Sequence, residues 1–203
     1  MSVTLDHPAP APIAEPPPPS DRESTPWLLL APLAVVLVGI GLYVADEDGF
    51  VAREIVGAAI IAAWIFAGVS LSIHRALRPL GTWVLAGATI ASASFVACAG
   101  VAQGWTGAGG TVVEVARPFG IGLLPAFGLA ILLALPAGRL DSQARRVGAA
   151  VGFGVGIALG AFLWSIRPDL PAWLLWTASA LLLLCGLPGA HRSYLRTGGL
   201  ERQ

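Results

Sequence analysis

The sequence predicts an all-α integral membrane protein: a bundle of six transmembrane helices with the N and C termini in the cytoplasm. Its composition, its six apolar segments and its placement of arginine each support this fold class. Of its 203 residues, 56% are hydrophobic and 12% are charged, whereas a water-soluble domain carries about a quarter charged residues. Because the chain lacks the polar surface that a soluble protein needs, we expect a multi-pass protein of the cell membrane, with the lipid bilayer as its solvent.

The first segment of the chain is rich in proline. Residues 1–26 hold eight of the sixteen prolines and almost no large apolar side chain. Such a composition cannot bury a core and is typical of a disordered tail with polyproline II character. We therefore expect a disordered cytoplasmic tail at 1–26, a membrane domain at 27–190 and a short basic cytoplasmic tail at 191–203.

Six apolar segments make up the predicted membrane domain. Each is close to the roughly 20 residues that cross the hydrocarbon of a bilayer, and the interior of each is free of Asp, Glu, Arg and His. The predicted spans are Trp27–Ala45, Glu54–Ile73, Thr82–Gln103, Pro118–Ala137, Val147–Ile166 and Leu170–Ala190.

The basic residues orient these spans. The second-to-third loop carries one histidine and two arginines, and the fourth-to-fifth loop and the C-terminal tail carry three arginines each, while each alternate loop carries one arginine. Since cytoplasmic loops carry the excess of Arg and Lys, these three segments are predicted to be cytoplasmic. Six of the seven tryptophans lie at predicted span ends, as membrane-interface residues should. The residues that anchor the topology are Arg75, Arg78, Arg139, Arg145, Arg146, Arg192 and Arg196.

A stripe of glycines indicates how the fifth span packs. Gly148, Gly152, Gly156 and Gly160 recur every four residues, so they lie along one slowly winding face of a helix. Small residues at this spacing let two membrane helices approach closely. The stripe can serve packing within the chain or a homodimer, and the sequence leaves both open.

The sequence contains no recognisable catalytic, cofactor-binding or metal-binding site. Its glycines lack the lysine and hydroxyl of a phosphate-binding loop, its two cysteines lie in apolar runs, and its histidines have no neighbouring ligands at metal spacing. Twelve basic residues balance twelve acidic ones, which argues against nucleic acid as a partner. One ligand site is conceivable at the predicted outer interface, although membrane-belt residues explain the same tryptophans: Trp105, Trp164, Trp173 and Trp176.

Three short motifs carry a family resemblance. Leu132–Arg146 (LLALPAGRLDSQARR) resembles the "LLxFPxGRLxSxxxR" hinge in the membrane-sensing region of actinobacterial sensor histidine kinases, with Leu135 and Ala137 in place of the usual Phe and Asp. The tail Arg196–Gln203 is similar to that family's arginine-glycine-"ERQ" element. Arg78–Trp83 is similar to its "NPxGW" motif, although the Asn is absent and an extra residue precedes the Trp.

The resemblance implies a sensory module of a two-component system. Such a module would relay an envelope or membrane signal to a cytoplasmic histidine kinase or response regulator. The family's phosphoacceptor-histidine helix and ATP-binding domain are missing from this sequence, so this chain alone is not expected to be an enzyme, whereas a full-length relative would be an ATP-dependent protein histidine kinase. The alternative is a free-standing membrane scaffold or small transporter subunit, with the glycine stripe as its interface.

Overall fold

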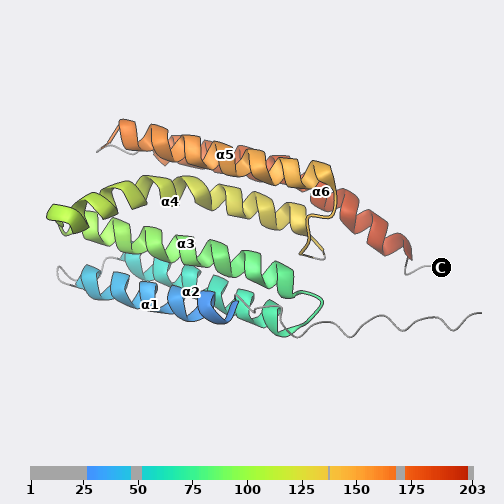
Figure 1. Cartoon of the computed structure of the whole chain (residues 1–203), viewed down its shortest axis with the longest axis horizontal. Coiled ribbons are helices and arrows are strands. Elements are labelled where there is room, and N and C mark those ends of the chain that lie inside the picture. The colour runs from blue at the N-terminus through green and yellow to red at the C-terminus, as the bar shows by residue number, and fades with distance from the viewer. Residues whose placement is uncertain (1–26, 47–51, 137, 168–171, 201–203) are drawn as a thin grey trace, which may run out of the picture.

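The computed structural model describes residues 27–46, 52–136, 138–167 and 172–200. Within these ranges the chain forms six α-helices and no strand, which confirms the all-α, six-helix prediction. The helices lie side by side in an elongated bundle (Figure 1). They are α1 Trp27–Ala45, α2 Ala52–Ile73, α3 Arg78–Ala102, α4 Gly107–Ala134, α5 Gln143–Ser165 and α6 Ala172–Leu200.

Four of the helices, α2 to α5, are long and apolar enough to cross a membrane. Among the residues searched, α1 and α6 contribute the shorter apolar stretches Leu29–Ala45 and Thr177–His191. Many large apolar side chains of the bundle are exposed, including Leu29 at 76% and Phe66 at 76%. Lipid is the environment that accepts such a surface, and we therefore describe the chain as a helical membrane protein.

Two helices run well past the apolar segments that predicted them. Helix α4 begins at Gly107 rather than Pro118, and α6 continues to Leu200 rather than ending near residue 190. At the start of α4, a β-carbon at Gly100 would lie 3.2 Å from the Val113 side chain and 3.0 Å from the Trp105 ring. The extra turns of α4 thus pack on the last turns of α3, and this contact sustains a helix where glycines and charges predicted a loop.

Helices α3 and α4 form the centre of the bundle. Helices α1 and α2 pack on α3, and α5 and α6 pack on α4, so that the central pair lies between two outer pairs (Figure 1). The core of the first half is a cluster of buried residues from α1, α2 and α3: Ala34, Ile61, Ile65, Leu85 and Ala88.

Small residues bring α2 and α3 into close contact. A β-carbon at Gly81 of α3 would lie 2.6 Å from the Ser72 backbone nitrogen and 2.7 Å from the Gly68 carbonyl oxygen. Ser72 is fully buried, and its Oγ donates a 2.7 Å hydrogen bond to that same Gly68 oxygen. The serine is thereby satisfied within its own helix, which leaves the crossing free of unpaired polar groups.

Consecutive helices run in opposite directions. The α2–α3 turn, the α4–α5 connection and the labelled C-terminal end of α6 consequently lie at the same end of the bundle (Figure 1). We call this the hinge end, after the hinge at residues 135–142. The opposite end holds the last turn of α3, the start of α4 and the end of α5.

Candidate functional site

The hinge between α4 and α5 is held by local hydrogen bonds. Gly138 has φ +73°, a left-handed conformation that glycine adopts without strain, and its N–H donates to the Ala134 oxygen at 2.7 Å. The Oγ of Ser142 accepts from the backbone N–H of Arg145 at 3.2 Å and caps the N-terminus of α5. These bonds hold Gly138 against the end of α4 and define the entry of the chain into α5.

The hinge rests on the first turn of α3. A β-carbon at Gly138 would meet the Leu80 backbone nitrogen and would lie 2.8 Å from the Leu80 Cα. Position 138 therefore requires glycine for two reasons, its positive φ and this backbone contact. Two of the motifs that carry the family resemblance, Arg78–Trp83 and Leu132–Arg146, thus contact each other, and no local pattern in the sequence could have predicted this contact.

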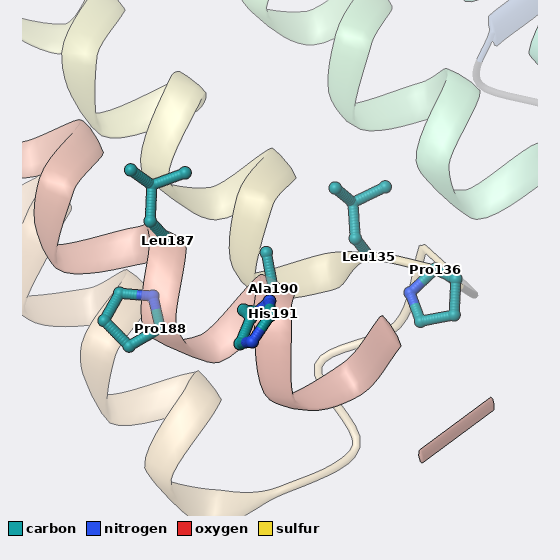
Figure 2. A pocket seen from close by; sticks show the side chains of 6 residues that line it. All are labelled: Leu135, Pro136, Leu187, Pro188, Ala190 and His191. Atoms are coloured by element: carbon teal, nitrogen blue, oxygen red, sulfur yellow. The ribbon is translucent and has the colours of Figure 1, made fainter. Parts of the chain in front are cut away.

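An open apolar pocket of about 800 Å³ separates the hinge from α6. Figure 2 shows the side chains of the hinge on one side and those of α6 on the other. The lining residues are Leu135, Pro136, Leu187, Pro188, Ala190 and His191.

Helix α6 is attached to the bundle mainly through α4. Leu183 of α6 reaches Gly128, where an added β-carbon would lie 3.0 Å from its Cδ2, and Gly186 lies against Leu129 and Leu132. Pro188 stands inside α6 at the edge of the pocket. Because proline has no N–H, it removes one helical hydrogen bond there and makes the helix easier to bend.

The glycine stripe of α5 faces α4 in the same chain. A β-carbon at Gly152 would lie 2.6 Å from Leu129 Cδ2, and one at Gly156 would lie 2.9 Å from the Gly122 oxygen. At Gly160 the nearest atom is the Cα of Phe119, at 2.8 Å. A dimer built on these glycines would have to displace α4.

An aromatic cluster joins α3, α4 and α5. The rings of Phe127 and Phe153 meet edge to face with centroids 5.0 Å apart, and the Trp83 ring stacks on Phe153 at 6.2 Å. The sequence indicated only that Trp83 lies near a span end. Its partners lie 44 and 70 residues further along the chain, so no local pattern could have identified them.

The arginines that the sequence predicts to anchor the topology lie at the hinge end. Arg75, Arg139 and Arg146 are exposed, and the Nε of Arg146 donates to the Leu140 oxygen at 2.8 Å. The Nε of Arg78 reaches the Ser72 oxygen at 3.5 Å. Arg145 supplies the capping N–H described above, while Arg192 and Arg196 lie in the last turns of α6, and their side chains are outside the described set.

The four predicted outer tryptophans lie near helix ends: Trp105 follows α3, Trp164 is at the end of α5, and Trp173 and Trp176 are at the start of α6. Trp105 packs on Gly100 and Gly110, whereas Trp164 lies under the guanidinium of Arg167, 4.9 Å from its ring centroid. Trp173 is 69% exposed, and the side chain of Trp176 is not among those described. In the described part of the chain, no group of three or more His, Cys, Asp or Glu residues could hold a metal ion.

Comparisons with protein-family models, with curated proteins and with solved structures find no match to this chain. The function therefore has to be argued from the hinge, the pocket and the helices beside them.

Proposed function

We propose that the chain is a sensory module of the cell membrane, similar to the membrane region of an actinobacterial sensor histidine kinase. It passes an envelope or membrane signal to a cytoplasmic histidine kinase or response regulator. The packing of the hinge carries the proposal. Gly138 ties the hinge to α3, and Leu135 and Pro136 face α6 across the pocket. A shift of α4 therefore changes the surface beside the hinge-end half of α6.

Helix α6 is the output element in this proposal. It rests chiefly on α4, has an open pocket beside Leu187 and Ala190, and loses a backbone hydrogen bond at Pro188. Each of these features lowers the free-energy cost of moving its last turns relative to the rest of the bundle. The central helices α3 and α4 each contact three other helices and form the rigid frame of the bundle.

The orientation of the module follows from charge. Exposed Arg75, Arg139 and Arg146 lie at the hinge end, and basic residues near the ends of spans favour the cytoplasmic side. The proposal therefore places six spans in the membrane with the hinge, the last turns of α6 and both termini in the cytoplasm. The alternative, a scaffold assembled through the glycine stripe, is less well supported because α4 covers that stripe.

A deletion strain of the source organism tests the sensory role. Phosphorylation of its response regulators is followed by phosphate-affinity electrophoresis after treatment with a membrane-active amphiphile. We expect the deletion to abolish the phosphorylation of one regulator and a wild-type copy to restore it. Gly138→Ala should fail to restore it, while Gly154→Ala should succeed, since a β-carbon at Gly154 meets nothing within 4 Å. An unchanged phosphorylation pattern in the deletion strain would refute the proposal.

A further inference from the structure

A partly buried arginine near one end of the bundle has an unsatisfied nitrogen. Arg117 lies in α4, three residues after Glu114 and directly before Pro118, at the end opposite the hinge. Its Nε is buried, and among the described residues it has no hydrogen-bond partner. A buried donor without a partner is costly, and more so when it carries charge. A rotation of this partly exposed side chain that brings its guanidinium to a bound acceptor would recover that free energy.

A neighbouring ion pair fixes the depth of Arg117. The Nη1 of Arg167, two residues beyond the end of α5, lies 3.0 Å from the Oε2 of Glu114. From Glu114 to Ala134 helix α4 rises by about 30 Å, which is about the thickness of the bilayer hydrocarbon. Arg117 consequently lies roughly 4.5 Å inside the edge of that layer, where a phospholipid phosphate is within reach of a long side chain.

The local charge favours an anion. Arg167 pairs with Glu114 and also covers the ring of Trp164. Among the described side chains at this level, two guanidinium groups and one carboxylate thus leave a net charge of +1, while Asp169 lies outside the described residues. The other described acidic side chains at this end, Asp46 and Glu54, follow α1 and begin α2, and those helices pack on α3.

We propose that Arg117 binds the phosphate of an anionic phospholipid beside the Glu114–Arg167 pair. The phosphodiester offers oxygens that accept charge-assisted hydrogen bonds from a guanidinium. Free phosphate presents the same chemistry, but the site lies within the hydrocarbon layer inferred above, on helices that expose apolar side chains such as Val115 of α4 and Phe162 of α5. Those side chains suit acyl chains. The binding needs only this geometry and does not depend on the sensory role.

The test uses the full chain purified in a neutral detergent. Binding of short-chain phosphatidylglycerol and of phosphatidylcholine is measured by native mass spectrometry for wild type, Arg117→Gln and Arg139→Gln. The last variant makes the same charge change at an exposed residue of the hinge. We expect wild type to prefer phosphatidylglycerol, and Arg117→Gln to bind it at least about tenfold more weakly, as the loss of a charge-assisted hydrogen bond should give. Arg139→Gln should bind like wild type.

Two outcomes overturn the proposal. The first is equal binding of both lipids by wild type, which would refute the proposal even if Arg117→Gln fails to fold. The second is undiminished binding of phosphatidylglycerol by a folded Arg117→Gln. A competition with inorganic phosphate separates the two sources of the anion. Displacement of the lipid at millimolar phosphate would assign the site to free phosphate and overturn the lipid assignment, whereas lipid that stays bound supports it. This experiment measures no signalling, so a negative result would leave the proposed sensory function untouched. Equally, a negative result in the deletion strain would leave the lipid site untouched.

Discussion

Valine at position 122 should force α4 and α5 apart. The first atom of any side chain at Gly122 would lie 2.6 Å from the Gly156 carbonyl oxygen and 2.8 Å from the Gly160 nitrogen. Both are backbone atoms, so no side-chain rotation can relieve the clash. Since non-bonded heavy atoms settle near 3.5–4.0 Å, the helices must separate by roughly 0.5–1 Å, and a gap of that size forfeits a quarter to a half of each affected dispersion contact.

We expect Gly122→Val to lower the free energy of unfolding by about 1–3 kcal/mol, the usual cost of overpacking a close-packed interior. The matched control is Gly154→Val, also in a helix of this pair, where an added β-carbon meets nothing within 4 Å. The two variants share the change in helix propensity, so their difference isolates the packing term. Unfolding in mixed micelles of detergent and SDS, followed by tryptophan fluorescence, measures both.

Equal stability of the two variants would refute the close α4–α5 contact. A second readout separates packing within the chain from packing between chains. If the stripe served a homodimer instead, Gly122→Val would leave the oligomeric state unchanged, and valine at a stripe position such as Gly156 would dissociate the dimer without destabilising the monomer. Size-exclusion chromatography with light scattering distinguishes these cases.

Substitutions at three other positions test other contacts. Gly138→Ala should destabilise by about 1–3 kcal/mol, because it strains a positive φ and overpacks the Leu80 backbone, and the loosened hinge should be cleaved faster by a protease in detergent. Ser72→Ala should cost under about 1 kcal/mol, because only one hydrogen bond within the helix is lost, whereas Ser72→Leu should cost about 1–3 kcal/mol by colliding with Gly81, as measured by unfolding in SDS. Arg167→Ala should change stability by under about 1 kcal/mol, since its ion pair is half-exposed; a larger loss in the same assay would show that the pair is shielded from water.

Hydropathy predicted the helices well but their ends poorly. The apolar run of residues 118–137 overlaps most of the stretch of α4 from Glu114 to Ala134 that is inferred to cross the hydrocarbon, yet the helix starts at Gly107. An apolar run reports where side chains must tolerate lipid, whereas a helix can continue into water as long as its backbone hydrogen bonds hold. The glycines and charges of residues 107–117 disfavour an isolated helix, and contact with α3 outweighs that preference.

The candidate site was predictable only in part. The glycine stripe and the hinge arginines follow from spacing and composition. Two other features join residues that are far apart in the chain: the contact of Gly138 with the Leu80 backbone and the aromatic cluster around Phe153. Local sequence patterns carry no information on such pairs. Arg117 was assigned to a loop because charge marks the predicted edge of a span. The structure instead places it inside α4, three residues after the Glu114 of the Glu114–Arg167 pair.

The order of helix contacts bears on how the protein is made. Every extensively packed pair consists of helices that are adjacent or next but one along the chain: α1 with α2 and α3, α2 with α3, α3 with α4, and α4 with α5 and α6. Each helix therefore finds its packing partners among helices that are close to it in the chain, and such contacts cost little loop-closure entropy. The bundle can therefore assemble in the order in which its helices leave the ribosome, with α6 docking last onto a frame that is already complete.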